Sequence, residues 1–304
     1  MLRSAWEQLP LTIEHQTVTR LERPHRTTAI VQLEGRGEHG YGEEVTFQPS
    51  DLLQESPRAG WDFSGTFGEF SQWLASLDLF ERAPEYDVVR NYRRWAFEAA
   101  ALDLALHQAG AGFAETVGRV PEPVHFVVSP PPGFTRVPAM VRLKIDAVDL
   151  RPDLRVDVID FKGKGDEAAV ESAFALYPAA FLEDPPVVLP GAHVSWDMSI
   201  TSADEISRLP ARPSAINVKP ARVGSVSALF DLYDRCTAEG IAMYGGGQNE
   251  LGPGRAQIQL LASLFHPRAP NDVAPAGYNE PTPVAGLPTS PLEIVPRIGF
   301  GAFD

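Results

Sequence analysis

A short apolar run in the C-terminal half of the chain ends in a lysine and a proline: Ala215-Ile216-Asn217-Val218-Lys219-Pro220. Similar runs, separated by loops and by stretches with helical spacing, recur from Val124 onward. Short, largely apolar strands that alternate with helices are typical of a parallel sheet whose outer face is covered. The pattern therefore predicts a (β/α) TIM-type barrel over residues 113–285. The expected strands are 124–128, 140–145, 156–161, 180–182, 193–196, 215–218 and 241–244.

The first part of the chain, residues 1–112, has a different pattern. Alternating apolar and polar residues, with a Gly-rich turn at Glu34-Gly35-Arg36-Gly37, predict an antiparallel meander, and helical spacing follows it. The expected strands include 11–18 and 28–33, and the expected helices are 67–80 and 92–110. Residues 1–112 are thus predicted to be an α+β domain, and we expect the C-terminal tail, about 286–304, to pack back on it. The predicted fold class of the whole chain is α/β.

Composition excludes several classes of protein. The 304 residues carry a formal net charge of −14 without a clustered basic face, so nucleic acid is not an expected partner. No run of about 18 apolar residues occurs, so no membrane partner is expected. The N-terminus lacks the pattern of a signal peptide, and the single Cys236 cannot form an internal disulfide. We therefore expect a cytoplasmic protein.

Polar residues end the apolar runs in a regular way. Three consecutive runs end in carboxylates, Asp160, Glu183 and Asp197, and lysines end the runs on either side of them, Lys144 and Lys219. The carboxyl ends of barrel strands meet at one face of the barrel, so the three carboxylates are expected to converge on one hard cation. Mg²⁺ prefers such ligands, and Mn²⁺ is the alternative.

Such a site suits removal of a proton from the carbon α to a carboxylate. That proton is weakly acidic, so the enediolate needs stabilisation as it forms, and a divalent ion on the substrate carboxylate provides it. A lysine acts as a base only when neutral, and a metal ion and a second cation nearby lower its pKa. Arg142, two residues from Lys144 on the same strand face, is the candidate for that second cation. The expected partner is a small-molecule carboxylate substrate.

Several motifs resemble the enolase superfamily, in particular its muconate-lactonizing and o-succinylbenzoate synthase-like subgroup. The barrel motifs are Arg142-Leu143-Lys144 in place of Lys-x-Lys, Glu183-Asp184-Pro185, Asp197, Val218-Lys219-Pro220-Ala221-Arg222-Val223-Gly224 and Gly245-Gly246-Gly247-Gln248-Asn249-Glu250. The N-terminal motifs are Gly40-Tyr41-Gly42-Glu43 and the series Ala96, Ala100, Asp103. The resemblance covers nearly the whole chain. It implies a capping domain followed by a modified TIM-type barrel, with Asp160, Glu183 and Asp197 as Mg²⁺ ligands and Lys144 and Lys219 as the acid/base pair.

The spacing departs from the family pattern. Asp160 comes only 16 positions after Lys144, and Asp197 only 14 positions after Glu183. A crossover with a full helix needs about 10 to 12 connecting residues, so some barrel helices, those after the second and fourth strands, are expected to be shortened or absent. The third strand ends Asp160-Phe161-Lys162, where the family has Asp-x-Asn, and this places Lys162 near the predicted metal.

Weaker candidates for supporting or substrate-binding roles are Arg142, Lys162, Asn217, Asn249 and Glu250. Lys162 could equally form a structural ion pair with Asp160 or Glu183, and Asp157 is the fallback ligand if the strand end lies earlier. Asp184 is expected to point away and cap a loop. No histidine lies between His193 and His266 to serve as a seventh-strand base, which favours chemistry with two lysines.

The resemblance leaves the specific reaction open. One lysine forms the enediolate, and then either the other returns a proton, giving racemisation or epimerisation, or a β-leaving group departs, as in o-succinylbenzoate synthase-like dehydration or cycloisomerisation. Ammonia-lyase and acid-sugar dehydratase reactions are further enzymatic alternatives. A different class is a non-catalytic descendant that binds a metal or ligand, with the lysines turned out of the pocket. Apolar faces left by missing helices also make a homo-oligomer an open prediction.

Overall fold

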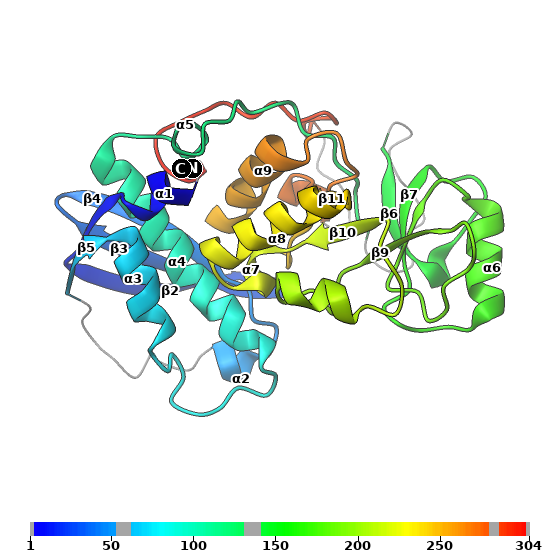
Figure 1. The fold of residues 1–304 in the computed structure, drawn as a ribbon, viewed down its shortest axis with the longest axis horizontal. Coiled ribbons are helices and arrows are strands. Elements are labelled where there is room, and N and C mark those ends of the chain that lie inside the picture. The colour runs from blue at the N-terminus through cyan, green and yellow to red at the C-terminus, as the bar shows by residue number, and fades with distance from the viewer. Residues whose placement is uncertain (1–2, 53–61, 131–140, 280–285, 302–304) are drawn as a thin grey trace.

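The fold is described by a computed structural model for residues 3–52, 62–130, 141–279 and 286–301. An N-terminal layer of strands and helices lies beside a curled parallel sheet with helices on its outside (Figure 1). No helix in these described ranges is long and apolar enough to cross a membrane.

The N-terminal part combines a three-stranded antiparallel sheet, β2-β3-β4, with a separate pair of strands, β1 and β5. Its elements are α1 (Arg3–Glu7), β1 (Pro10–Ile13), β2 (His15–Arg23), β3 (Arg26–Gly35), β4 (Glu38–Glu44), α2 (Pro49–Leu52), β5 (Phe63–Thr66), α3 (Phe67–Ala75), α4 (Val88–Ala109) and α5 (Phe113–Thr116). The predicted meander and both predicted helices are present. The run 11–18 is not one strand, however: it divides at Glu14 between β1 and β2, which belong to different sheets.

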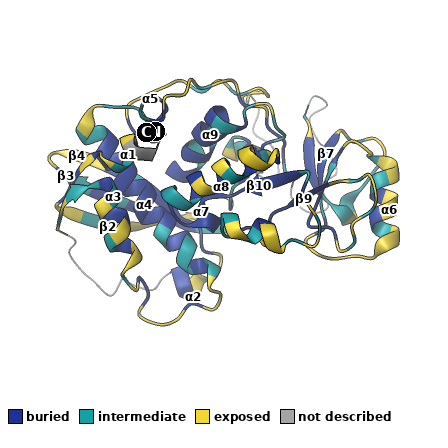
Figure 2. Ribbon diagram, viewed as in Figure 1, coloured by how far each residue is buried: buried dark blue, intermediate teal, exposed yellow. Residues whose placement is uncertain are grey.

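Helix α4 is the buried centre of this part (Figure 2). Strand β4 approaches it so closely that a Cβ at Gly42 would lie 2.0 Å from the Ala96 carbonyl oxygen, and one at Gly40 would lie 2.3 Å from that of Ala100. Asp103, one turn further along α4, accepts a hydrogen bond from the backbone N–H of Tyr41 at 2.9 Å. The small side chains of the glycines and alanines in the two N-terminal motifs therefore allow the backbones of β4 and α4 to approach each other closely.

The C-terminal part contains a six-stranded parallel sheet in the order β11-β10-β9-β8-β7-β6. Single-residue parallel bridges extend it: Val128 with Leu143, Gly246 with Asp272, and Phe126 with Asn271. These bridges join both edges of the sheet and close it into a barrel. The TIM-type fold class is confirmed, and the predicted strands at 156–161, 193–196 and 215–218 match closely. The strands are β6 (Leu143–Asp146), β7 (Val156–Asp160), β8 (Phe181–Glu183), β9 (His193–Trp196), β10 (Ala215–Val218) and β11 (Ala242–Gly245).

The helical coat of the barrel is incomplete. Helices follow β7, β10 and β11: α6 (Glu167–Leu176), α7 (Pro220–Val223), α8 (Val226–Glu239) and α9 (Pro253–Phe265). After β6 there is only the short 3₁₀ turn η1 (Ala147–Asp149), and residues 184–192 after β8, all of them described, contain no helix. The shortening expected after the second and fourth strands is therefore confirmed. The fifth strand, β9, is also followed only by a 3₁₀ segment, η2 (Ala203–Arg208), and η3 (Ala276–Asn279) ends the barrel region.

The missing helices divide the apolar core outside the barrel strands. One cluster joins α4 to β9, β10 and α8, through residues such as Leu102, Val194 and Leu229. A second joins β6, β7 and β8 to α6, through residues such as Ile159 and Val170. A small third cluster, Val158, Ala215 and Tyr244, draws on β7, β10 and β11. The two larger clusters divide between β8 and β9, where no helix links the strands, whereas helix α9 contributes side chains to both.

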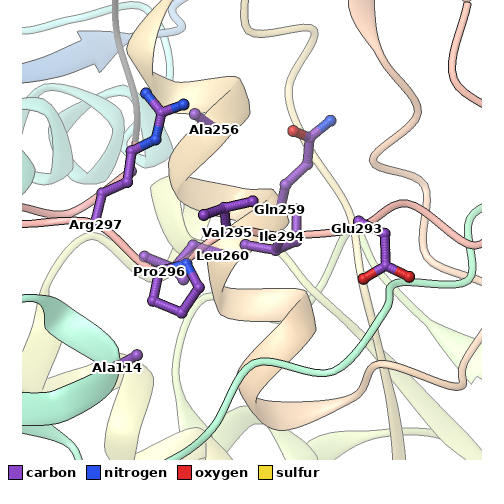
Figure 3. A pocket seen from close by; sticks show the side chains of 10 residues that line it. Ala114, Ala256, Gln259, Leu260, Glu293, Ile294, Val295, Pro296 and Arg297 are labelled. Atoms are coloured by element: carbon purple, nitrogen blue, oxygen red, sulfur yellow. The ribbon is translucent and has the colours of Figure 1, made fainter.

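The C-terminal tail returns to the first part of the chain. Phe300 is buried, its ring lies 4.7 Å from that of Phe113, and its backbone N–H donates to Asp103 Oδ1 at 2.6 Å. Upstream, Val295 and Pro296 line a crevice of about 220 Å³ with Leu260 of α9 (Figure 3). These contacts agree with the expected return of the tail, while the domain boundaries themselves stay a prediction.

Candidate active site

Three carboxylates lie at the carboxyl ends of neighbouring strands in the parallel sheet. Asp160 ends β7 and is paired in register with Glu183, which ends β8, and Asp197 directly follows β9. Parallel strands present their carboxyl ends on the same side, so the three side chains face a common region. The predicted strand-end arrangement of these residues is thus present in the structure, whereas their role as metal ligands stays a proposal.

Lys144 lies among these carboxylates. It projects from β6, is 6% exposed, and forms a close ion pair with Glu183 Oε1. Its Nζ is also 3.7 Å from an oxygen of Asp160 and 3.7 Å from an oxygen of Asp272. These carboxylates raise the pKa of Lys144 well above its ordinary value, although burial alone would lower it. The ammonium group of Lys144 is therefore a cation that these three carboxylates share.

Lys219 approaches from the other side. It follows β10, is 9% exposed, and its Nζ donates to Asp197 Oδ2 at 2.7 Å. The other oxygen of Asp197 pairs closely with Arg222 of α7, which also donates to the Asp197 carbonyl at 2.7 Å. Burial would raise the pKa of Asp197, but Lys219, Arg222 and Lys144 together lower it. Asp197 is therefore held as a carboxylate between two cations.

Glu183 is fully buried and both of its oxygens have protein donors. Oε1 receives Lys144, whereas Oε2 receives Asn217 Nδ2 at 2.9 Å and the hydroxyl of Tyr244 in a short hydrogen bond. Ser195 on β9 lies 2.9 Å from the same hydroxyl. Neutral donors from β10 and β11 thus fix one oxygen of Glu183, and among the described residues its charged contact, Lys144, is on the other oxygen.

The loop that carries Asp197 is held by Asp184. Its carboxylate accepts from the backbone N–H groups of Asp197 and Met198, each at 3.0 Å, and its φ of 45° turns the chain sharply after Glu183. Asp184 thus faces away from Lys144 and caps a loop, as expected from the sequence.

The donor set suits a hard divalent cation. Burial first, and then the charge of Glu183, raise the pKa of Asp160 to about 7 against the opposing effect of Lys144, so the carboxylates lie close enough to repel one another. A cation between them relieves that repulsion, and oxygen ligands are those that Mg²⁺ prefers. Within the described residues no group of three or more His, Cys, Asp or Glu side chains is already arranged to hold a metal ion. Glu183 Oε1 and both oxygens of Asp197 are paired with basic side chains instead.

Two weaker candidates lie outside this cluster. The prediction that Arg142 places its charge beside Lys144 is wrong: Arg142 is exposed and pairs with Asp157 on β7. Residues two apart on a strand share a face but lie roughly 6.6 Å apart along it, so Arg142 is at the opening strand end while Lys144 reaches the carboxyl end. This ion pair also holds Asp157, the fallback ligand, away from the region that Asp160, Glu183 and Asp197 share. Lys162 is exposed and pairs with Asp146 at 2.6 Å, although its backbone N–H donates to Asp160.

The last two candidates lie on the loop after β11. Glu250 is 4% exposed; one oxygen accepts from the Gln248 N–H at 2.8 Å, and the other is buried without a hydrogen-bond partner in the described structure. Asn249 is exposed, with a φ of 57°. Gly246, on the same loop, lies against Asn217 and Lys219, since a Cβ there would be 2.3 Å from Asn217 Oδ1 and 3.0 Å from Lys219 Cε.

Three residues of the site had no assigned role in the sequence. Asp272, on the bridge that closes the barrel, receives Ser129 Oγ at 2.8 Å and lies near Lys144. Tyr244 and Arg222 hold Glu183 and Asp197. Arg222 could have been found, because it belongs to the Val-Lys-Pro-Ala-Arg-Val-Gly motif; Asp272 follows no recognisable strand pattern and Tyr244 reads as an apolar strand residue.

The first part of the chain reaches this loop through Glu43. Its carboxylate is buried and accepts from the backbone N–H groups of Leu251, Gly252 and Gly254 at 2.6, 2.9 and 3.1 Å. Burial, followed by the charge of Glu250, raises the pKa of Glu43. The Glu of the Gly-Tyr-Gly-Glu motif therefore ties β4 to the loop after β11 and the start of α9.

Comparison with known proteins agrees with this architecture. Two models of one family match the chain: the Domain of unknown function (DUF8230) N-terminal domain over residues 4–116, and the DUF8230 C-terminal domain over residues 139–280. Among curated proteins, o-succinylbenzoate synthase of Bacillus subtilis (strain 168) is 36% identical over 83 residues, and N-succinylamino acid racemase of Amycolatopsis sp is 41% identical over 59 residues. Those matches cover 27% and 19% of this chain and only 22% and 16% of the relatives' own lengths.

Solved structures resemble nearly the whole chain. A muconate cycloisomerase variant has a TM-score of 0.66 over 97% of both chains at 16% identity. Muconate lactonizing enzyme from Pseudomonas putida has a TM-score of 0.60, at 17% identity, over 84% of this chain and 86% of that chain. An enolase superfamily member from Listeria innocua has a TM-score of 0.59, at 16% identity, over 97% and 93%. The predicted resemblance is confirmed, and at these identities the structures show a shared fold. The chain carries both domains of the DUF8230 family, belongs to that family, and has the fold of the enolase superfamily.

Proposed function

We propose that this protein is a Mg²⁺-dependent enzyme that removes a proton from the carbon α to a substrate carboxylate. The observation that carries the proposal is the position of two buried lysines. In the order of the sheet, Lys144 on β6 and Lys219 after β10 flank the three strands that end at Asp160, Glu183 and Asp197. A substrate held over these carboxylates would present its two faces to two different lysines.

The choice of lysine supports acid/base chemistry. The basic residues of the chain are mostly arginines; its lysines are Lys144, Lys162, Lys164 and Lys219. Of these, Lys144 and Lys219 are buried and the other two are exposed. Arginine is protonated at every working pH, whereas a lysine can release its proton and act as a base. Lysines are thus present in the buried site, where a reversible proton carrier is useful.

Asp160, Glu183 through Oε1, and Asp197 are the residues that would hold the ion. A bound Mg²⁺ would polarise the substrate carboxylate and lower the barrier to enediolate formation. One lysine takes the α-proton. The other either returns a proton to the opposite face, which inverts the carbon without net loss of a bond, or protonates a β-leaving group that departs with its bonding electrons. The names of the relatives, a racemase, a synthase of o-succinylbenzoate and a cycloisomerase, support these two outcomes.

The decisive experiment is exchange of substrate α-protons in D₂O with and without Mg²⁺, followed by mass spectrometry. The panel contains N-acyl amino acids, dipeptides, acid sugars and β-substituted amino acids, so that racemisation, dehydration and ammonia loss are all detectable. We expect Mg²⁺-dependent deuterium uptake that Lys144→Met and Lys219→Met each lower by roughly 10²-fold or more, as loss of an acid/base group does. Lys164→Met, which removes an exposed lysine, is the matched control. Exchange that survives both buried-lysine substitutions would sink the proposal.

A second candidate function is binding of a metal or ligand without turnover. It is favoured by the ion pairs that already join both lysines to the carboxylates, because a lysine held as an ammonium cation does not act as a base. Against it, neither lysine is turned out of the site. Saturable Mg²⁺ binding by calorimetry, with no exchange for any member of the panel, would favour this candidate over the first.

A further inference from the structure

A second pocket lies where the first part of the chain meets the barrel. Its cavity volume is about 300 Å³, and its walls include Arg23, His25 and Arg26 at the β2–β3 turn, Phe47 after β4, Glu250 on the loop after β11, and Arg255 on α9. We call it the junction pocket, and we propose that it binds a small oxyanion, a carboxylate or phosphate group. Neither Lys144 nor Lys219 lines this pocket, and the proposal does not rest on the proposed reaction.

The junction pocket is rich in positive charge. The chain as a whole carries −14, yet three guanidinium groups line this one pocket. Within the described residues none of the three forms an ion pair with a carboxylate. Arg255 donates to the carbonyls of Ala274 and Glu250, both at 3.2 Å, and Arg23 to that of Glu22 at 3.1 Å. Carbonyl dipoles satisfy hydrogen bonds but do not cancel a net charge, so the pocket keeps a positive field that attracts anions.

Two of the three arginines have N–H groups left for a ligand. A guanidinium has five N–H groups. Arg26 directs all of its nitrogens to the backbone carbonyls of Thr27, Val45, Thr46, Gln248 and Asn249, and so contributes charge and shape. Arg255 donates one hydrogen bond to a carbonyl from each of its two terminal nitrogens, so each of these nitrogens keeps a second N–H group for a ligand. Arg23 has one carbonyl partner and is otherwise exposed. Arg23 and Arg255 are therefore the anion donors.

The remaining walls define the rest of the ligand. The Phe47 side chain is 48% exposed and its ring lies 3.9 Å from the guanidinium carbon of Arg26, which holds it as a flat apolar surface. Glu250 in the pocket wall and the buried Glu43 behind it both act on Arg26, so the charges of Arg23 and Arg255 are the ones left to attract a ligand. A ligand with a single anionic group and a short carbon body fits this combination of charge and apolar wall.

The test measures binding without turnover. The probes are inorganic phosphate and butyrate, titrated separately by calorimetry at constant ionic strength. We expect saturable binding that the double variant Arg23→Met/Arg255→Met weakens by about tenfold or more, because hydrogen bonds to charged groups are lost. Arg20→Met, which removes an arginine paired with Glu22 at 3.1 Å outside the pocket, should leave binding unchanged. The single variant Arg23→Met, at an exposed position, gives a smaller loss in a protein whose folding is not at risk.

Two further arms distinguish the source of the anion. If the anion belongs to the substrate, phosphate inhibits α-proton exchange competitively and the arginine variants raise KM. If it is a separate small molecule, phosphate changes the exchange rate without competing. Absence of saturable binding for both probes, or binding that is equal in the wild type and in the double variant, would overturn the proposal whether or not the protein proves to be an enzyme.

Discussion

The Tyr244 hydroxyl donates to Oε2 of Glu183, the same oxygen that Asn217 holds, and leaves Oε1 as the oxygen with a charged contact. Tyr244 comes from β11 and Glu183 from β8, so this hydrogen bond crosses the barrel interior between strands that are not neighbours in the sheet. It fixes which oxygen of the glutamate can serve an incoming cation.

Tyr244→Phe should therefore loosen Glu183. The substitution removes a hydrogen bond to a fully buried carboxylate, and we expect a loss of about 2 kcal/mol in the free energy of unfolding, together with weaker Mg²⁺ binding. Chemical denaturation and calorimetry measure the two effects. Tyr233→Phe is the control, because the Tyr233 hydroxyl is buried without a hydrogen-bond partner in the described structure, and its removal should be close to neutral. Equal losses in both variants would contradict the role assigned to Tyr244.

Gly42→Ala should disrupt the packing of β4 on α4. The new Cβ would lie 2.0 Å from the Ala96 carbonyl oxygen, which is backbone and cannot rotate away. We expect a loss of about 3 kcal/mol or more, measured by thermal or urea unfolding. In Gly68→Ala the nearest atom, the Glu7 carbonyl oxygen, is 3.1 Å away, so a much smaller change is expected there. A well-folded Gly42→Ala protein of wild-type stability would refute the close approach.

His266 should give the stability of the protein a specific pH dependence. Burial lowers its pKa to about 4 in spite of the hydrogen bond to Asn271, whereas its ordinary value is 6.5. Between these values the unfolded chain binds a proton that the folded chain does not, so this group makes stability rise with pH from about 4 to 6.5 and contributes no slope above that window. The span corresponds to about 3 kcal/mol. Urea unfolding of wild type and His266→Gln across this range should give profiles that converge at low pH; parallel profiles would contradict the shift.

The C-terminal tail should be a stabilising element. Phe300 is buried against Phe113 and Trp95, so Phe300→Ala is expected to cost about 3 to 5 kcal/mol in unfolding free energy. Ile298→Ala, two residues earlier at a half-exposed position, serves as the comparison and should change little. Similar unfolding midpoints for the two variants would show that the tail does not contribute to the core.

The residues at the carboxyl ends of the barrel strands were predicted well from the sequence, because a single rule places them. Polar residues that end apolar runs lie at the carboxyl ends of parallel strands, so Asp160, Glu183 and Asp197 could be placed together before any coordinates. Lys219 followed from the same rule. The short connections after Lys144 and Glu183 also predicted the loss of helices, because a crossover helix does not fit into so few residues.

What the sequence could not predict depends on depth along a strand and on contacts between distant segments. Alternation placed Arg142 on the same face as Lys144 but could not say that it lies one pleat repeat lower, beside Asp157. Asp272 joins the site through a single-residue bridge that leaves no periodic pattern. In the sequence, Tyr244 is indistinguishable from an apolar strand residue. Its hydroxyl can bind Glu183 only because β11 and β8 face each other inside the barrel.

The divided outer core has a consequence for the way the candidate site is held together. Lys144, Asp160 and Glu183 stand on strands that belong to one apolar cluster, whereas Asp197 and Lys219 stand on or directly after strands that belong to the other. The candidate site therefore straddles a seam, bridged by the pairing of β8 with β9 and by the Tyr244 hydroxyl. Between β8 and β9 no helix helps to hold the two halves of the site together, so the pairing of these strands, the Tyr244 hydrogen bond and helix α9, which contributes to both clusters, take that part.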